Sequence, residues 1–265
     1  MAQYNIDRGA KLTNNDTIYE VMMLGDQDGN IINTFGAASN VIISAGDLAG
    51  YTGVHKYGAV FGSASGDMST VWTAADTAGT KLYPWSHSAG TLSVVSTSGS
   101  DTGDITIQGL DASYNFVEET LTLTGTSPVT GSTSFTRVNR AFMVDDTNIG
   151  KIQASISSTV VTEIAAGFGQ TLQCFYTVPA SKTGYLMNLS ASASKNQVVD
   201  LFLFQRPFGG AFRVQTTMSL NQSNQQLDYP IPLKFTEKTD IDLRTQGSSN
   251  ATISAEFTIV LVDND

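Results

Sequence analysis

The chain has 265 residues, 14% of them charged, and a formal net charge of −10. This length can bury one large hydrophobic core or two ordinary ones, and the charged fraction falls below the roughly 25% of a typical soluble domain. The excess of acidic residues argues against nonspecific binding of nucleic acid or of an anionic membrane, because such partners require lysine and arginine to neutralise phosphate groups.

Residues 1–50 are expected to form an N-terminal arm and hairpin. The opening stretch MAQYNIDRGAKLTNN is polar, lacks the hydrophobic core of a secretion signal and shows no alternation, so we expect a partner to order it. Tyr19–Leu24 is a strand candidate, and the Asp28-Gly29 dipeptide predicts a hairpin turn before Ile31–Phe35. We expect this region to act as an anchor.

Residues 51–168 are expected to form a β-sandwich domain with long loops. The part up to about Gly90 has weak periodicity, but its aromatic residues are too frequent for a disordered segment, so we predict ordered loops. From Thr91 onward, alternating apolar and polar residues predict half-buried strands. These strand candidates are Leu92–Val95, Ile105–Gln108, Glu119–Thr124, Phe135–Val144, Lys151–Ile156 and Val160–Ile164.

Residues 169–265 are expected to form a jelly-roll-like β domain, because strand-length segments recur between turn signals. Pro230 and Pro232 remove two backbone donors from one segment, which predicts an edge or irregular strand. The run Val198–Phe204 is apolar beyond simple alternation, which predicts burial on both faces and part of a subunit interface. The strand candidates are Thr171–Val178, Gly184–Ser190, Val198–Gln205, Phe212–Met218, Leu227–Lys234, Asp240–Thr245 and Thr252–Val262.

The predicted fold class is therefore all-β, with two antiparallel β-sandwich domains, the C-terminal one jelly-roll-like, and an extended N-terminal segment. No segment shows convincing amphipathic helical periodicity, and no apolar run approaches the roughly 20 residues that span a bilayer. Cys174 is the only cysteine, so no disulfide can form within the chain. Its apolar neighbours predict a buried, inert thiol. These features fit a protein made in a cytoplasm.

The titratable residues show no recognisable catalytic or metal-binding pattern. His55 and His87 have no Cys, His, Asp or Glu at metal-ligand spacing, so we expect structural or solvent-facing imidazoles. Glu118 and Glu119 are adjacent and would point to opposite faces of a strand, which argues against a facing acid–base pair. Carboxylates distant in sequence can still meet across a sandwich, as in glycan-cleaving enzymes. The candidates on or beside strands are Asp104, Asp200, Asp240 and Asp242.

Two further motifs are interpreted as turns. Asp26, Asp28 and Asn30 have the spacing of a calcium loop, but position twelve is Ala37 where such a loop needs glutamate, so we place them in the hairpin turn. Gly209-Gly210 lacks the lysine and helix of a phosphate-binding loop and predicts a turn. We expect no catalytic, cofactor-binding or metal-binding residue and no enzymatic activity.

The aromatic residues of the loop-like region allow two interpretations. Trp72, Tyr83 and Trp85 could stack on sugars, since binding residues often lie on loops. Alternatively, they fill a small core beneath the long loops, which we expect. A glycan-binding module should present a cluster of exposed aromatic residues in one concave groove.

Eight stretches, in order along the chain, carry a resemblance to a known family. They are VHKYG (Val54–Gly58), LSVVSTSGSDT (Leu92–Thr102), GLDASYNFVEETLTLTGTSPV (Gly109–Val129), FTRVNRAFMV (Phe135–Val144), AAGFGQTLQCFYTVPASKTGYL (Ala165–Leu186), RPFGGAFRV (Arg206–Val214), FTEKTDIDLR (Phe235–Arg244) and SAEFTIVLVDN (Ser254–Asn264). In these stretches the chain resembles structural proteins of marine tailed phages, cyanophages included. YTVPASKTGYL (Tyr176–Leu186) also resembles the opening strand pair of jelly-roll domains in phage decoration and cement proteins.

The resemblance implies a structural protein of a tailed-phage virion, made in the host cytoplasm. The most specific interpretation is a capsid decoration or cement protein, a homotrimer that stabilises the shell by bridging subunits of the major capsid protein. The alternatives are a tail, neck or head-fibre protein, or a glycan-binding module for host attachment. The expected partners are the major capsid protein, further copies of this chain and, for the last alternative, a host surface glycan. No nucleic acid, membrane or cofactor is expected.

Overall fold

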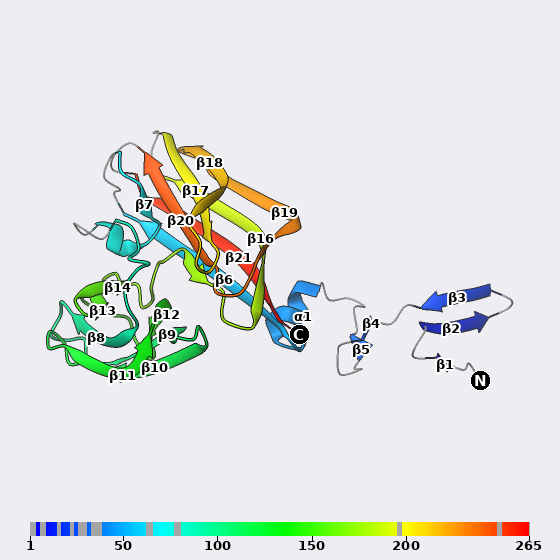
Figure 1. Cartoon of the computed structure of the whole chain (residues 1–265), viewed down its shortest axis with the longest axis horizontal. Helices are drawn as coiled ribbons and strands as arrows, with labels where there is room; N and C mark the ends of the chain where they lie inside the picture. Colours follow the sequence, from blue (N-terminus) through cyan, green and yellow to red (C-terminus); the bar gives the residue numbers. More distant parts are fainter. Residues whose placement is uncertain are drawn as a thin grey trace.

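The computed structural model describes residues 4–5, 9–14, 17–21, 24–25, 31–32, 39–61, 66–76, 81–194, 198–247 and 251–264. Within these ranges the chain consists mainly of antiparallel strands, which confirms the predicted all-β class. Two β-sandwiches lie next to each other, and the short N-terminal strands lie apart from them (Figure 1).

Five short strands form two small sheets in the N-terminal region. β1 (Tyr4–Asn5), β2 (Gly9–Asn14) and β3 (Thr17–Val21) form one sheet, and β4 (Leu24–Gly25) pairs with β5 (Ile31–Ile32). The β4–β5 pair flanks the expected hairpin turn, whose residues 26–30 lie outside the described ranges. The strand expected over residues 19–24 overlaps β3, which begins at Thr17 and pairs with β2, and residues 22 and 23 lie outside the described ranges. The polar β2 lacks the apolar alternation that reveals a strand.

Residues 90–164 form a seven-stranded sandwich, here called the middle domain. Its strands are β8 (Gly90–Ser96), β9 (Asp104–Leu110), β10 (Phe116–Thr122), β11 (Val129–Phe135), β12 (Arg137–Met143), β13 (Ile152–Ile156) and β14 (Thr159–Ile164). One sheet has the order β11-β8-β13-β14 and the other β10-β9-β12. Leu92, Ile107 and Phe135 are fully buried, as expected for the side chains that alternate strands direct between two sheets.

The second sandwich has the strand order of a jelly roll. Its strands are β6 (Tyr51–Val60), β7 (Ser69–Thr70), β15 (Phe175–Thr177), β16 (Lys182–Ala193), β17 (Val198–Arg206), β18 (Arg213–Asn221), β19 (Asn224–Phe235), β20 (Asp240–Gly247) and β21 (Ile253–Asp263). One sheet, here called the β6 sheet, has the order β19-β16-β21-β6. The other, the β20 sheet, has the order β15-β20-β17-β18, with β7 also paired to β20. The chain crosses repeatedly between the two sheets, which produces the Greek-key connections of a jelly roll.

The middle domain is inserted into the jelly roll. β7 pairs with Arg244 and Thr245 of β20, and β15 pairs with residues 240–242 of the same strand. The chain therefore leaves one edge of β20, forms the middle domain and returns further along that edge. This corrects the expected boundary at residue 51, because β6 pairs with β21 along its whole length. A partner so distant in sequence leaves no local signal.

β6 is a ten-residue strand in a stretch that was expected to be loop. Its buried positions include Lys56 and Gly58, so the alternation of apolar residues is interrupted twice. A Cβ at residue 58 would come within 2.4 Å of the Cys174 backbone nitrogen and 2.6 Å of the Val71 oxygen. Only glycine, which has no Cβ, therefore fits at residue 58, where β6 packs against the segment that leads into β15.

Helices contribute little to the described part of the chain. The one α-helix there, α1 (Ser39–Ala45), has seven residues, and η1 (Thr73–Asp76) is a short 3₁₀ helix. These lengths agree with the lack of helical periodicity in the sequence. No helix in the described ranges has both the length and the apolar character needed to cross a membrane.

β19 is an edge strand of the β6 sheet, as Pro230 and Pro232 predicted. Its pairing with β16 shifts register, and both prolines lie in the unpaired stretch between Asp228 and Leu233. The apolar run Val198–Phe204 forms part of β17, and its expected role in a subunit interface stays a prediction. Its alternate residues are buried in the core, and Phe204 on the outer face is covered by Arg244, whose guanidinium carbon lies 4.4 Å from the ring centroid.

Candidate functional site

Asp240 pairs with two arginines, of which Arg137 joins the two domains and Arg206 lies on the neighbouring strand of the same sheet. Asp240 lies on β20, and only 4% of its side chain is exposed. Arg137 of the middle domain donates from Nε to Oδ1 at 3.0 Å and from Nη2 to Oδ2 at 3.3 Å. Arg206 of β17 donates from Nη2 and Nε to Oδ2 at 2.5 and 2.9 Å, and Thr177 Oγ1 donates to Oδ1 at 2.6 Å. Charge-assisted bonds of this kind demand a fixed geometry, so this junction holds one domain against the other.

The Trp85 ring packs against both arginines of the junction. The guanidinium carbons of Arg137 and Arg206 lie 5.3 and 5.6 Å from its ring centroid, within cation–π range. Tyr83 packs against Trp85 with ring centroids 4.6 Å apart and against Phe175 at 4.1 Å. The rings exclude water from the ion pairs and so strengthen them.

The three aromatic residues that could have stacked on a sugar are all buried. Trp72, Tyr83 and Trp85 have exposed fractions of 1%, 2% and 7%. The expectation that they fill a small core beneath the loops is confirmed. The alternative of sugar stacking at these residues is wrong, because their rings pack on the outer face of the β20 sheet.

Asp242 anchors the loop that carries Trp85. Its Oδ2 accepts bonds from Trp85 Nε1 and Arg244 Nε, both at 2.8 Å, and from Thr70 Oγ1 at 3.3 Å. Burial raises the pKa of the Asp242 carboxyl, while the charge of Arg244 and these hydrogen bonds oppose the rise. Asp240 is therefore paired with Arg137 and Arg206, and Asp242 with Arg244.

The four strand carboxylates singled out in the sequence do not all come together. Asp240 and Asp242 are neighbours on one strand, whereas Asp104 belongs to the middle domain and accepts from Thr122 Oγ1 at 2.6 Å. Asp200 lies at the far end of β17 from the junction and accepts from Ser219 Oγ at 2.5 Å. Asp104 and Asp200 therefore each accept a structural hydrogen bond within their own domain.

His87 and Cys174 lie beside the junction, whereas His55 lies on β6. His55 on β6 is exposed, and its Nε2 lies 3.3 Å from Glu256 Oε2. Burial lowers the pKa of His87, and a hydrogen bond with the Ser88 carbonyl opposes this. Cys174 is buried as predicted, and burial raises the pKa of its thiol. Among the residues that the structure describes, no three His, Cys, Asp or Glu side chains lie close enough together to hold a metal ion.

Glu118 and Glu119 have separate structural partners. Glu118 Oε2 accepts from Gln108 Nε2 on the neighbouring strand at 2.6 Å. Glu119 Oε1 accepts from Ser132 N and Oγ at 2.6 and 2.9 Å and from Thr133 N at 3.1 Å. Ser132 and Thr133 belong to β11 of the facing sheet, so Glu119 joins the edges of the two sheets.

The two motifs interpreted as turns have different outcomes. Gly210 N donates to Pro207 O at 2.8 Å, and Gly209 has a φ of +71°, which gives the expected turn. The proposed hairpin residues Asp26, Asp28 and Asn30 lie outside the described ranges.

Sequence reasoning missed the arginines of the junction. Arg137 and Arg206 occur within or at the end of apolar strand runs, FTRVNRAFMV and VVDLFLFQR. Arginine is rarely buried unless it is paired, so an arginine in such a run was an available signal of a buried ion pair. The partner could not be identified, because Asp240 lies about 100 residues from Arg137 in the sequence.

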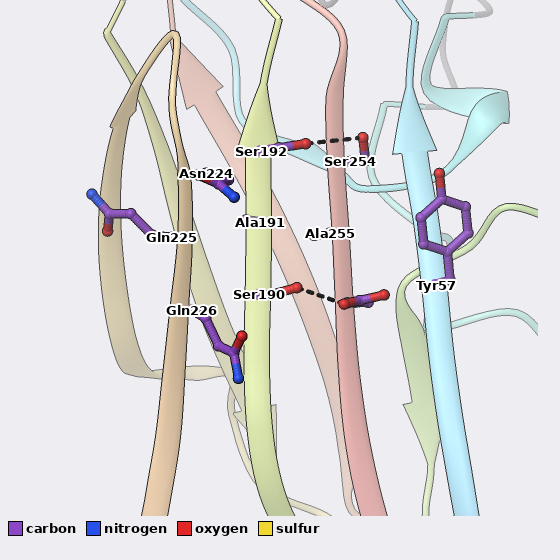
Figure 2. A pocket seen from close by; sticks show the side chains of 10 residues that line it. Tyr57, Ser190, Ala191, Ser192, Asn224, Gln225, Gln226, Ser254 and Ala255 are labelled. Atoms are coloured by element: carbon purple, nitrogen blue, oxygen red, sulfur yellow. Dashed lines mark hydrogen bonds between the residues drawn. The ribbon is translucent and has the colours of Figure 1, made fainter.

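A shallow polar depression lies on the outer face of the β6 sheet (Figure 2). Its volume is about 370 Å³, and Tyr57 on β6 lies opposite Asn224 and Gln226 of β19, with serines between them. Ser190 Oγ donates to Glu256 Oε1 at 2.7 Å, and the Ser192 and Ser254 hydroxyls lie 3.3 Å apart (Figure 2). Tyr57 is the sole aromatic residue of its lining, so the depression lacks the aromatic cluster expected of a glycan-binding groove.

The edge formed by β18 and β19 exposes apolar side chains. The exposed fractions are 85% for Ile231, 47% for Val214 and 36% for Leu227. The first five residues of β19 are all exposed. An unpaired edge strand with apolar side chains is a common site of association with another chain.

Comparisons with known proteins do not supply a family. No protein-family model matches the chain, and no curated protein matches it. A solved structure of infectious bursal disease virus, Gx strain, is 9% identical with a TM-score of 0.23, over 80% of this chain and 72% of that chain. The crystal structure of the infectious bursal disease virus VP2 subviral particle is 11% identical with a TM-score of 0.20, over 81% and 72%. At such low similarity the fold assignment rests on the strand order. The class it defines is a two-domain all-β protein with a jelly roll.

Proposed function

We propose that this protein is a structural component of a tailed-phage virion, most specifically a capsid decoration protein that bridges subunits of the major capsid protein. The observation that carries the proposal is the open apolar edge of the jelly roll at β19. The eight stretches that resemble structural proteins of marine tailed phages support it from the sequence.

The edge of β19 is suited to contact between copies of this chain. Its outer side carries unpaired main-chain groups, and Ile231 and Leu227 project from it into solvent. Natural monomers protect such edges with charges, bulges or covering loops. Here the prolines interrupt the strand, but apolar side chains remain exposed. We assign this edge to self-association, and threefold closure would match the symmetry of capsid axes.

The junction fits the same role. A protein that bridges subunits must keep its contact surfaces at a fixed separation. Arg137 joins the domains through buried, charge-assisted bonds to Asp240, which Arg206 of the same sheet also holds in place. This suits a rigid body better than a pair of tethered modules.

Sedimentation equilibrium tests the self-association. The wild-type protein is expected to have the mass of a trimer at micromolar concentration, and Ile231→Asp the mass of a monomer. Ile149→Asp is the matched control, because Ile149 is 65% exposed but lies in the middle domain. A monomeric wild-type protein, or equal effects of the two substitutions, would contradict the assignment.

Copy number per particle tests the place on the virion. A stained gel of purified particles should show on the order of hundreds of copies for a shell protein. A number on the order of ten would favour the tail or neck alternative.

We propose further that residues 1–50 anchor the protein to the particle. A variant that lacks residues 1–15 should keep the fold of the two sandwiches and bind particles more weakly, because the described strands of this region pair only with one another. Normal decoration of particles by the truncated protein would contradict this role.

The proposal assigns no enzymatic activity to the chain. Purified protein incubated with host surface polysaccharide should release no reducing ends. Steady release that an Asp→Asn change at Asp104, Asp200, Asp240 or Asp242 abolishes would favour a depolymerase instead.

A further inference from the structure

A groove between the jelly roll and the middle domain is lined by cationic side chains. One cavity of about 380 Å³ is bordered by Lys56, Arg140, Lys182 and Phe116. A second cavity of about 380 Å³ shares His55, Lys56 and Arg140 with the first. The chain has 24 acidic and 14 basic residues, so this groove reverses the charge of the molecule locally.

Lys56 is a buried cation. Its side chain extends from β6 toward the middle domain, and the residue is 7% exposed. Nζ donates to the backbone oxygen of Asn139, the one hydrogen-bond acceptor that the described residues offer it. An ammonium group carries three donors, and a buried charge without a counter-ion is unfavourable.

Neither Lys56 nor Arg140 has a carboxylate partner among the described residues. Arg140 Nη2 donates to Gln170 Oε1 at 3.0 Å, and its guanidinium carbon lies 4.7 Å from the Phe142 ring centroid. The other buried cation that crosses between the domains, Arg137, is fully paired with Asp240. Two adjacent cations without a counter-ion therefore point to an anion from outside the chain.

We propose that this groove binds the carboxylate of an acidic sugar, held by Lys56 and Arg140, with the sugar ring packed on Phe116. Phe116 is 61% exposed, and its ring offers an apolar face at the rim of the cationic cavity. The volume lies at the lower end of the roughly 300–1,000 Å³ range of small-ligand sites, which suits a single sugar residue. This site goes beyond the proposed virion role and does not depend on it.

The lining distinguishes an acidic sugar from simpler ligands. An inorganic anion would engage Lys56 and Arg140 but leave the Phe116 ring in water. A neutral sugar would cover the ring but leave both cations unpaired, so it would bind more weakly.

Binding should depend on pH through Lys56. Burial lowers its pKa to about 8, with the charge of Cys174 opposing and that of Arg140 adding to the decrease. The charged and titratable groups around it are His55 with Glu256, Arg140, Lys182 with Asp263, Cys174, Tyr57 and Tyr176. Arginine stays charged throughout this range, so affinity should fall as pH rises through about 8 and Lys56 loses its proton.

The test is a titration of the full-length chain with glucuronate, glucose and inorganic sulfate, followed by calorimetry and by saturation-transfer NMR. Glucuronate is expected to bind at least about tenfold more tightly than either other probe, because only it engages both the cations and the ring. Lys56→Met should weaken glucuronate binding at least about tenfold by removing one charge-assisted bond. Lys151→Met is the matched control, since Lys151 pairs with Glu163 in the middle domain, and it should leave binding unchanged.

Arg140→Gln is the second variant, in case Lys56→Met does not fold, and it should weaken glucuronate binding to a similar degree. Equal affinity for sulfate and glucuronate would overturn the assignment to a sugar. Absence of glucuronate binding, or unchanged binding in both variants, would overturn the site. Loss of self-association in the variants without any sugar binding would mean that the cations bind a protein carboxylate, which also overturns the proposal.

Discussion

The middle domain is built from strands that follow one another along the chain, whereas the jelly roll takes strands from both sides of that insertion. In the middle domain, β9 and β10 form a hairpin, as do β13 and β14. In the jelly roll, Val60 pairs with Ile253. Pairing of such distant strands is slow because a long loop must close first. The middle domain can therefore form early, and the jelly roll closes only when the chain is complete.

The edges of the two sandwiches differ as well. In the middle domain, Glu119 of β10 accepts three hydrogen bonds from β11 of the facing sheet, so polar bonds join the two edges. In the jelly roll, β18 and β19 leave Val214, Leu227 and Ile231 exposed. The β10 and β11 edges of the middle domain are thus joined to each other, whereas the jelly roll keeps an open edge suited to assembly.

The largest effect is expected where the two domains meet. Asp240→Asn removes the counter-ion of Arg137 and Arg206 and leaves both guanidinium groups uncompensated at the junction. Breaking a buried ion pair in this way should lower the free energy of unfolding by about 3–5 kcal/mol. Urea unfolding followed by circular dichroism measures the change. Fluorescence should show an earlier transition than circular dichroism, because both tryptophans lie in or beside the junction.

Asp200→Asn is the control for that change. Asp200 is on the same sheet and accepts one bond from Ser219, but it lies at the exposed end of β17. Its replacement should alter the free energy of unfolding by less than about 0.5 kcal/mol. Similar effects of the two substitutions would mean that the junction is not what couples the domains.

The second prediction concerns pH and Lys56, which lies between the domains. The pKa of Lys56 is lowered from 10.5 to about 8 in the folded protein. Between these values the unfolded chain binds the extra proton, so the stability contributed at this site rises with pH. Relative to Lys56→Met, wild-type protein should gain about 1–3 kcal/mol between pH 8 and pH 10.5.

The difference from Lys56→Met isolates this group. Burial raises the pKa of Cys174 and of Tyr176, and these groups lower stability as pH rises, because the unfolded chain ionises first. The contribution of Tyr176 is the same in both proteins and cancels, and that of Cys174 cancels apart from its coupling to the charge of Lys56. A wild-type advantage that stays constant across this range would show that Lys56 titrates normally.

The third prediction concerns Gly58, where β6 packs against the segment at Cys174 that returns from the middle domain. Gly58→Ala places a Cβ within 2.4 Å of the Cys174 nitrogen and should lower the free energy of unfolding by about 2 kcal/mol. Gly53→Ala is the matched control on the same strand, where the nearest atom, Ile43 Cγ2, is 3.7 Å away. Thermal unfolding of both variants measures the contrast. Equal losses of stability in the two variants would indicate that β6 is loosely packed against the segment at Cys174.

β6 also shows how far the sequence predicts this fold. Strands such as β9, β13 and β21 alternate apolar and polar residues, and each was expected close to its observed position. β6 was missed because two of its buried positions are not apolar. Lys56 bonds to Asn139 of the middle domain, and Gly58 packs against the backbone at Cys174. Lys56 thus contacts the middle domain and Gly58 contacts segments distant in sequence, and a local pattern contains neither contact.

The junction itself was only half predictable. The sequence identified Asp240 and Asp242 as strand carboxylates and placed Trp85 beneath the loops. It could not pair Asp240 with Arg137, because that contact depends on where the inserted domain docks. The sandwich and its turns follow from local chemistry, whereas the buried charges follow from tertiary structure.

The smallest change in stability is expected where Glu119 of β10 bonds to β11 in the middle domain. Glu119→Ala removes three hydrogen bonds to Ser132 and Thr133 of β11. Because these bonds are accessible to solvent, the free energy of unfolding should fall by only about 1 kcal/mol. Glu118→Ala, which removes one exposed bond to Gln108, should change it by less than about 0.5 kcal/mol.

Hydrogen exchange of the β11 amides sharpens this last contrast. Ser132 N and Thr133 N donate to Glu119 across the gap between the sheets, so their exchange should accelerate in Glu119→Ala and stay unchanged in Glu118→Ala. The freed β11 edge then resembles the open edge of β19, and the variant should aggregate sooner on heating. If neither exchange nor aggregation changes, the polar bonds of Glu119 do not close that edge, and the difference between the two sandwiches must lie in their side-chain polarity alone.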